Sequence, residues 1–470
     1  MKKNMSQQGT YLSEKQMKQA LEFYRTVINE SFIKEIHSSL GLVRRSTVFN
    51  SSVGLWLMIL QRLQPNKTLA GAVELLKPGG VSELFDESGK HIQVGKISGS
   101  TGGYSQARQR EPLKLVEQVS DRLTKSIVST HKKSTVENLK TYIVDGSTIR
   151  LNYSQGNLKK YPQYQNQHGK AHYPLMRIMV ATDAVTGVVE RPSYGAYSGD
   201  EATSELALVE DLLPRLEPGS LVIGDRYFGC TRFATAAVKS GLHVIARVKE
   251  VNVKKFTGVI GDKQGEKEIQ WDSNRSTTGT PHSVKGRLVW FTLKQKGLRP
   301  IKLVLFTTLS LPIRKIVELY GLWWNVELDI RNMKSTLEMD FIDAKSPEMV
   351  AKELILGVAA YNLVRHFMLA SSKKLKLTPR DLSFARALLR VNIIGTSPHE
   401  DSKVKEYYLN NLLADAKSLQ LPKRKTPRVP EPRKVWPRGQ VSTMSNSRES
   451  ERKKILDSYS TSNISKMELN

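Results

Sequence analysis

The chain has 470 residues, of which 39% are hydrophobic and 25% are charged. This length predicts about two to four structural units of a globular protein. No apolar run reaches the roughly 18 residues of a membrane span. The first residues, Met1-Lys2-Lys3, are not followed by the apolar core of a signal peptide. We therefore expect a cytoplasmic protein.

The charge balance is strongly basic. Lys and Arg number 72 against 45 Asp and Glu, which gives a net charge of +27. A chain with this balance repels itself unless an anionic partner binds, and nucleic acid is the usual partner. Net charge alone fits a ribosome-associated protein equally well. The single cysteine, Cys230, excludes disulfides and cysteine zinc sites, and we interpret it as a packed residue rather than a nucleophile.

Residues from about 12 to 125 are predicted to be helical. Apolar residues recur at helical spacing between Leu21 and Phe32, and further helices are expected at Val53–Leu63 and Leu69–Leu76. Pro112 opens another helix that runs to about Leu123. This pattern fits a helical DNA-binding domain, and it also fits an ordinary helical bundle with a basic surface.

A mixed pattern of strands and helices begins near Thr141 and predicts an α/β core. The expected strands are Tyr142–Val144, Thr148–Leu151, Met176–Ala181, Gly187–Glu190 and Ser220–Gly224, with a helix at Ser204–Leu213. Residues 231–309 are again strand-rich and are interpreted as an insertion in that core. Its candidate strands are His243–Val248, Gly258–Gly261, Leu288–Lys294 and Ile301–Thr307.

Two long helices and a basic tail follow. One helix is predicted from Ile313 to about Met339, and another from Pro347 to about Leu369. Between Leu421 and Gln440 there are seven basic residues, one acid and five prolines. Such a stretch cannot pack a core, so we expect it to be extended or disordered.

Two aspartates follow predicted strands. Asp145 comes after Tyr142–Val144, and Asp225 comes after the strand that ends at Gly224. Carboxylates just beyond strand ends can converge on one cleft, and carboxylates are the usual protein ligands of Mg²⁺ in phosphodiester chemistry. Asp-Gly after a strand is also a common turn, so neither aspartate identifies a site alone.

The predicted helix near residue 320 carries a polar stripe. At about 100° per residue, Tyr320, Glu327 and Lys334 fall nearly in line, and Arg331 joins them. The apolar residues Leu319, Leu322, Val326, Ile330, Met333 and Leu337 form a separate face. A hydroxyl and two cations beside a carboxylate suit a phosphate chain held next to a metal. A solvated face with a Glu327–Arg331 ion pair is the alternative.

These segments resemble the DDE transposases of bacterial insertion sequences, specifically the IS-four group. That group carries a Tyr-x2-Arg-x3-Glu-x6-Lys signature, and Tyr320, Glu327 and Lys334 match it in spacing. Ile143–Arg150 looks like the group's first aspartate motif and Ile223–Phe228 like its second. Ser105–Arg110 and Ala360–Arg365 are also similar to family segments. The resemblance covers roughly residues 100 to 390.

The resemblance implies an RNase H-like core with the insertion between the second aspartate and the glutamate. It implies cleavage of element ends by water with Mg²⁺ (or Mn²⁺), followed by strand transfer from the freed 3′-hydroxyl; some members pass through a DNA hairpin. Asp145, Asp225 and Glu327 then take the metal-ligand role. Tyr320 and Lys334 contact phosphate, with Arg331, Arg108 and Arg110 as further DNA contacts. The implied partner is double-stranded DNA, bound by a homodimer.

The sequence departs from the family pattern at the signature arginine, where Trp323 stands. Tryptophan cannot make arginine's bidentate phosphate contact. Trp323 can pack inward, stack on a displaced base, or mark a weakened copy. Trp290 is a second candidate for base stacking, with core packing favoured. His168 and His172 flank Gly169, and a loop is favoured there over a metal site.

Five regions are therefore predicted. They are a helical DNA-binding domain (1–125), the first part of the RNase H-like core (126–230), the β-rich insertion (231–309), the second part of the core (310–371) and a helical C-terminal region with the basic tail (372–470). Three functions fit: an active transposase, a DNA-binding protein that has lost cleavage, and a structure-directed nuclease. The first is favoured.

Overall fold

The computed structural model describes residues 23–42, 48–75, 100–130, 136–167, 169–249, 253, 256, 258, 264–273, 282–294, 301–394, 419–421 and 468–469. The chain divides into two compact units. Unit 1 comprises Met1–Val222, Ser240–Leu242 and Leu322–Leu421, and unit 2 comprises Ile223–Lys239, His243–Gly321 and Pro422–Asn470. The basic tail between Leu421 and Gln440 lies almost wholly outside the described residues.

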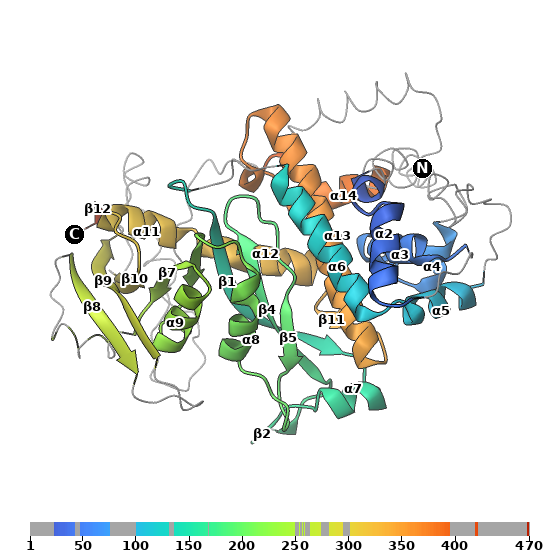
Figure 1. Cartoon of the computed structure of the whole chain (residues 1–470), viewed down its shortest axis with the longest axis horizontal. Coiled ribbons are helices and arrows are strands. Elements are labelled where there is room, and N and C mark those ends of the chain that lie inside the picture. Colours follow the sequence, from blue (N-terminus) through green and yellow to red (C-terminus); the bar gives the residue numbers. More distant parts are fainter. Residues whose placement is uncertain are drawn as a thin grey trace, which may run out of the picture. The chain divides into compact units, whose positions relative to one another are not determined.

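Helices from both ends of the sequence build one part of unit 1 (Figure 1). They are α2 (Glu30–Ser39), α3 (Ser51–Leu63), α4 (Leu69–Glu74), α5 (Gly102–Arg110), α6 (Leu113–Ser129), α13 (Pro347–Leu375) and α14 (Phe384–Ile394). The side chains of Asn50 and Thr68 cap α3 and α4 by accepting backbone N–H bonds. Both α3 and α6 pack against α13, so the predicted N-terminal helices share a core with residues 350–369.

The helix α13 is the most apolar long element. Pro347–Lys373 is long and apolar enough to cross a membrane, but 83% of its most apolar window is buried inside the protein. Val350, Leu354, Tyr361 and Val364 are all essentially inaccessible. The hydropathy of this helix therefore reflects its central place in the core.

A sheet completes unit 1. Its strands are β1 (Thr141–Leu151), β4 (Leu175–Asp183), β5 (Ser193–Ala196) and β11 (Phe341–Ile342). β1 pairs antiparallel with β4 from Tyr142↔Asp183 to Arg150↔Leu175, while β11 runs parallel to β1. The predicted break between the strands Tyr142–Val144 and Thr148–Leu151 is wrong, because Asp145 and Gly146 lie inside one continuous strand.

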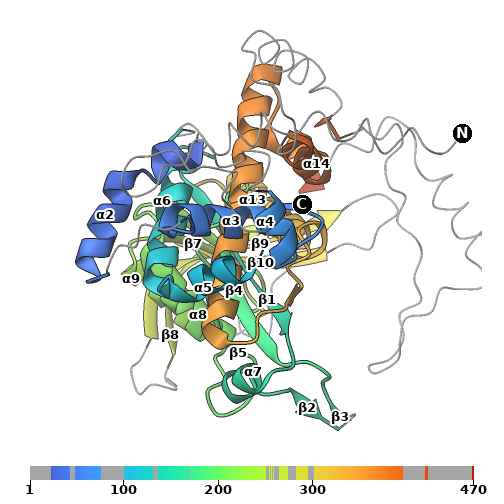
Figure 2. The same ribbon diagram turned by 90° about the vertical axis from the view of Figure 1, so that its right-hand side faces the viewer.

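Between β1 and β4 the chain forms an excursion with α7 (Gln155–Lys160) and a hairpin of β2 (Gln165–Asn166) and β3 (Gly169–Lys170). This hairpin projects beyond the end of the sheet (Figures 1 and 2). After β4, the predicted strand Gly187–Glu190 is wrong. Only an isolated bridge, Thr182↔Val189, forms there, because Gly187 turns the chain with φ = +72°. The helix α8 (Glu205–Leu212) and the turns η2 (Leu213–Arg215) and η4 (Pro379–Asp381) complete the unit.

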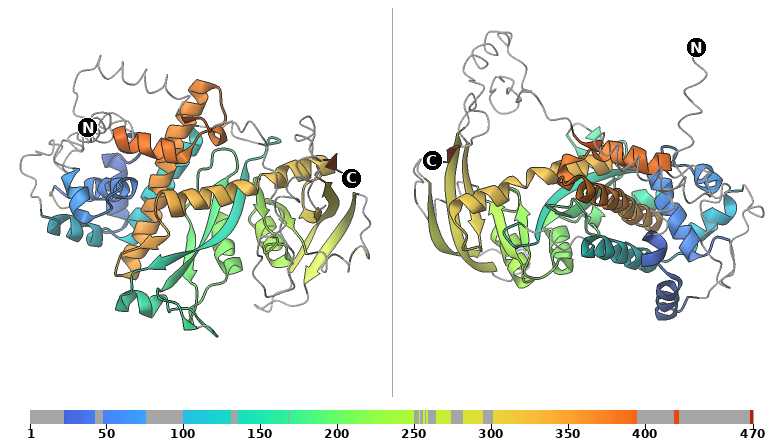
Figure 3. Two further views of the ribbon diagram at one scale, coloured as in Figure 1. Left: turned by 180° about the vertical axis from the view of Figure 1, so that it is seen from behind. Right: turned by 90° about the horizontal axis from the view of Figure 1, so that it is seen from above.

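β6 (Leu221–Gly224) crosses the boundary between the units. Unit 2 contains α9 (Thr231–Lys239), β7 (His243–Arg247), β8 (Gly265–Ser273), β9 (His282–Lys294), β10 (Ile301–Thr307), α11 (Ile313–Gly321) and β12 (Glu468–Leu469). Antiparallel pairing joins β7 to β10, β10 to β9, and β9 to both β8 and β12 (Figure 3). The predicted strands near 243, 288 and 301 are confirmed, β8 and α9 were not predicted, and Gly258–Gly261 lies largely outside the described residues.

The single helix predicted from Ile313 to Met339 is wrong. Helix α11 ends at Gly321, α12 spans Trp324–Arg331, and a π-helical turn, η3, spans Asn332–Thr336. Asn325 and Val326 donate to carbonyls only three residues back, which tightens the chain after Gly321, a poor helix former. Tyr320 and Glu327 therefore lie on different helices, and the in-line spacing derived for one helix does not apply.

Candidate active site

Asp145 lies in the middle of β1. It is opposite Val180 of β4, and the Gly146 N–H donates to its Oδ1 at 2.8 Å. Side chains alternate along a strand, so Asp145 and Ser147 share one face. Gly146 faces the other way, where an added Cβ would lie 2.9 Å from the carboxyl carbon of Glu205 on α8. Asp145 therefore points away from α8.

The helix α12 and the π turn after it pack on the Asp145 face of β1. Val326 and Ile330 are buried in the unit 1 core together with Ile143 and Ile149 of β1. The Lys334 ammonium donates to the Ser147 hydroxyl at 3.2 Å. The signature lysine thus lies beside the residue that shares a face with Asp145.

Glu327 projects from the exposed side of α12. The alternative ion pair with Arg331 does not form, although both side chains are described and exposed. A carboxylate left in water beside a lysine-bearing turn is available to a ligand. Asp145, Glu327 and Lys334 therefore all belong to unit 1.

Asp225 belongs to unit 2 and directly follows β6. Its Oδ1 accepts the Tyr227 N–H at 2.7 Å, which fixes the loop as an Asx turn. Gly229 completes this loop against β7, because an added Cβ would lie only 2.0 Å from the carbonyl oxygen of Arg247. The close approach holds Asp225 at a defined place near the end of β7.

Tyr320 lies in the same neighbourhood of unit 2. Burial raises the pKa of its hydroxyl to about 12; the nearby Arg247 guanidinium opposes this rise, and the Asp225 carboxylate adds to it. The phenol is therefore protonated at neutral pH and can donate a hydrogen bond. Arg247 was missed from the sequence because it ends an ordinary apolar strand and belongs to no motif.

The predicted metal ligands divide between the units. Asp145 and Glu327 are in unit 1, and Asp225 is in unit 2. Within the part of the chain that the structure describes, no group of three or more His, Cys, Asp or Glu side chains gathers at a metal-binding distance. The donor set itself, three carboxylates and no sulfur or imidazole, suits a hard cation such as Mg²⁺.

A buried ionic network holds α12 in place. Asp329, two residues after Glu327, is fully buried. Its Oδ1 accepts from the Tyr361 hydroxyl at 3.0 Å and from Arg380 at 2.7 Å, and it also pairs with Arg365. Arg380 further donates to the Ala184 carbonyl at 3.2 Å. The network ties the Glu327 helix to α13, to η4 and to the turn after β4.

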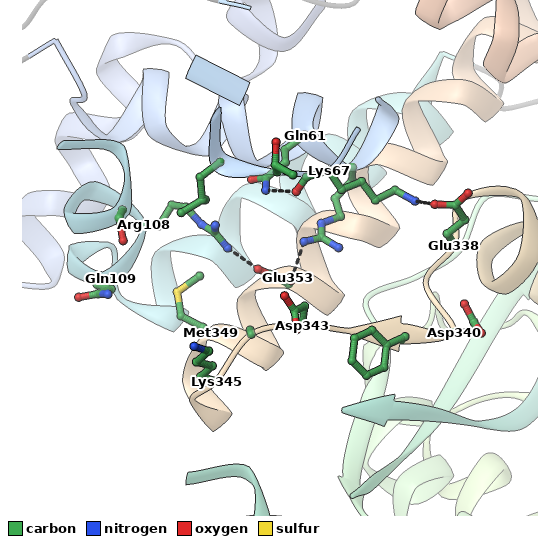
Figure 4. A pocket seen from close by; sticks show the side chains of 16 residues that line it. Gln61, Lys67, Arg108, Gln109, Glu338, Asp340, Asp343, Lys345, Met349 and Glu353 are labelled. Atoms are coloured by element: carbon green, nitrogen blue, oxygen red, sulfur yellow. Dashed lines mark hydrogen bonds and ion pairs between the residues drawn. The ribbon is translucent and has the colours of Figure 1, made fainter. Parts of the chain in front are cut away.

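The two arginines of α5 that were predicted to contact DNA each have a partner within unit 1. Arg108 is only 8% exposed and pairs with Glu353, which also accepts from Arg62 at 2.6 Å. These residues line a cavity of about 880 Å³ between the N-terminal helices and the start of α13 (Figure 4). Because Arg108 already has a buried counter-charge, a packing role accounts for it. Arg110 donates to the Phe49 carbonyl at 2.7 Å and stays partly exposed.

Trp323 packs inward. Its ring is partly buried against the unit 1 core and meets Trp324 edge-on at a centroid distance of 5.2 Å. The indole N–H is buried and reaches no acceptor among the described residues. Of the alternatives left open for this position, inward packing is the one the structure supports.

Trp290 likewise packs within its sheet, close against Gly265 of β8. His168 lies outside the described residues, and His172 is exposed.

Replacing Trp323 by arginine is expected not to raise cleavage. The substitution removes a packed aromatic ring, so we expect the free energy of unfolding to fall by about 1–3 kcal/mol. Urea unfolding and a strand-cleavage assay of Trp323→Arg test this, with Trp323→Phe as the control that keeps a ring. A gain in cleavage by the arginine variant alone would show that position 323 contacts phosphate.

Comparison with known proteins identifies the family that this chain resembles. Residues 138–363, which run from β1 to the middle of α13, match the transposase DDE domain family. The chain is 22% identical over 356 residues to the transposase InsG for insertion sequence element IS4 of Escherichia coli (strain K12), a match that covers 73% of this chain and 75% of that protein. Both matches support a DDE transposase of the IS4 group.

Proposed function

We propose that this transposase cleaves the ends of its element and joins them to target DNA, using divalent metal ions. The observation that carries the proposal is the Lys334–Ser147 hydrogen bond, which puts the signature lysine beside the Asp145 face of β1. A carboxylate for metal and an ammonium for phosphate are the groups that phosphodiester chemistry requires at close range. Family membership supports the same chemistry.

In this proposal Asp145, Asp225 and Glu327 hold Mg²⁺, or Mn²⁺ in its place. Bound metal would activate the attacking oxygen and stabilise the leaving oxygen. Lys334 and the protonated Tyr320 hydroxyl contact the phosphate, and Arg331 provides a further cation. Arg247 joins this set because its guanidinium lies near enough to Tyr320 to oppose the rise in the pKa of the Tyr320 hydroxyl.

The antiparallel order β1, β4, β5 followed by α8 supports an RNase H-like core, with residues 231–309 as an insertion before the glutamate. The five domain boundaries predicted from the sequence are part of this proposal. We propose that two copies hold two element ends during transposition, and that the protein acts on DNA in the bacterial cytoplasm.

Joining of DNA ends separates transposition from simple cleavage. We expect the protein, supplied with Mg²⁺, a duplex bearing the element's terminal inverted repeat and a plasmid target, to produce covalently joined molecules. Cut ends without joined products would indicate a structure-directed nuclease. Binding without cutting, in both Mg²⁺ and Mn²⁺, would indicate a DNA-binding protein that has lost cleavage.

A further inference from the structure

The excursion between β1 and β4 has an unusual composition. We define the β1–β4 arm as residues 152–174, which include α7 and the β2–β3 hairpin. No acidic residue occurs between Asp145 and Asp183, whereas Lys159, Lys160 and Lys170 lie in the arm. In a chain with 45 acidic residues, such a gap concentrates positive charge on one projecting segment.

The arm also exposes aromatic rings. Tyr153 is 60% exposed, Tyr164 39% and Tyr173 40%. Exposed tyrosines interleaved with lysines are typical of a surface that meets a sugar–phosphate chain, because the rings supply contact area and the cations neutralise phosphate. Tyr164 and Tyr173 each pack edge-on against a neighbouring ring, Tyr197 and Phe341 respectively, and keep an exposed part.

Not all of the cations near the arm are available. Lys160 pairs with Glu201, and Arg150, just before the arm, pairs with Asp340. Lys159 and Lys170 are exposed, and neither forms an ion pair with any residue that the structure describes. These two lysines are therefore the free charges that the arm presents.

The base of the arm is firmly anchored, which distinguishes it from a loose loop. The fully buried Asn157 donates to the carbonyls of Asn152 at 3.1 Å and Ala344 at 2.8 Å. Ser154 donates to the Lys345 carbonyl at 2.6 Å, and Gln163 donates to the Ala171 carbonyl at 2.6 Å. A rigid base with an exposed basic tip can hold a partner at a fixed distance from Asp145 of β1.

That distance is set by β1, which carries Asp145 and leads directly into the arm. A strand rises about 3.3 Å per residue, so the stretch from Asp145 to Leu151 spans about 20 Å. Stacked base pairs are about 3.4 Å apart, so 20 Å corresponds to about six base pairs. We propose that the β1–β4 arm binds the backbone of duplex DNA about six or more base pairs from the scissile phosphate. This inference rests on the proposed function for the position of the cut.

Salt dependence tests the contact. We would measure binding of a duplex bearing the terminal inverted repeat in a Glu327→Ala background, which prevents cleavage under the proposed function. Replacing Lys159 and Lys170 by Gln removes two phosphate contacts, so the slope of log K against log salt should weaken by about 1.8. The matched control is Lys239→Gln with Lys373→Gln, which removes two exposed lysines of α9 and α13. An unchanged slope in the arm variant, or an equal change in the control, would overturn the proposal.

Duplex length tests the position. Substrates that extend about 3 or about 12 base pairs beyond the cut, on either side, are compared. The unmodified arm should bind the longer duplex more tightly on one side, and the arm variant should lose that difference. If the arm variant lost the same affinity for the short and the long duplex, the contact would lie elsewhere. These results do not depend on which carboxylates bind metal: cleavage by Glu327→Ala would refute the ligand assignment, and the Lys159 and Lys170 slopes would still decide the arm.

Discussion

Replacing Glu327 by Ala is expected to slow strand cleavage at least about a thousandfold, a loss of about 4 kcal/mol in transition-state stabilisation. The cause is the loss of one metal-binding carboxylate from the exposed side of α12. DNA binding should persist, because removal of a negative charge does not weaken attraction to phosphate. Single-turnover cleavage and equilibrium binding, measured on the same duplex, test both expectations.

The control is Glu318→Ala, which removes an exposed carboxylate from α11 that pairs with Arg314 and Lys315. We expect this variant to cleave at the normal rate. Equal activity of both variants would show that Glu327 is not a metal ligand. Loss of binding by Glu327→Ala would instead point to a damaged fold.

Metal preference extends this test to the ligands in both units. Asp145→Cys and Asp225→Cys place a thiolate where a carboxylate stood, and sulfur binds the softer Mn²⁺ better than Mg²⁺. We expect cleavage by each variant to be lost in Mg²⁺ and partly restored in Mn²⁺. Cys230→Ser serves as the background, because Cys230 is the only natural thiol. Restoration for one aspartate and not the other would assign direct metal contact to that residue alone.

Replacing Asp329 by Ala is expected to destabilise unit 1 by about 3–5 kcal/mol. The substitution leaves the buried Arg365 and the largely buried Arg380 without their counter-charge, and breaking such a pair is more costly than losing an exposed one. Asp329→Asn keeps the shape and one acceptor oxygen, so we expect a smaller loss. The midpoint of urea unfolding measures the effect.

Asp340→Ala is the matched control for this prediction. Asp340 also pairs with an arginine, Arg150, but its side chain is 40% exposed. Exposed ion pairs contribute about 0–1 kcal/mol, so the control should unfold close to the unmodified protein. Similar losses in the two variants would mean that the Asp329 network is no stronger than a surface pair.

Local patterns in the sequence were sufficient to predict most elements of the site. The apolar run before Asp145, the strand before Asp225 and the apolar face around Val326 each have a period that identifies the element. The continuity of elements was harder to predict. β1 continues through Asp145-Gly146 because β4 pairs with it along its whole length, and this long-range pairing leaves no local signal.

Residues that act through distant partners were missed for the same reason. Asp329 belongs to no motif of the sequence, and its partners Tyr361 and Arg380 lie 32 and 51 residues away. Arg108 looked like a DNA contact because it stands in a basic run, yet its buried partner Glu353 lies 245 residues away. Pairing across such separations depends on the assembled core and cannot be read from spacing.

The Glu353 cluster also constrains how this protein can be shortened. A product that began after α6 would lack Arg62 and Arg108, so Glu353 would lose both of its counter-charges. The apolar side of α13 that α3 and α6 cover would also face water. The N-terminal helices are thus part of the smallest portion of unit 1 that can fold, and a shortened variant would have to keep them.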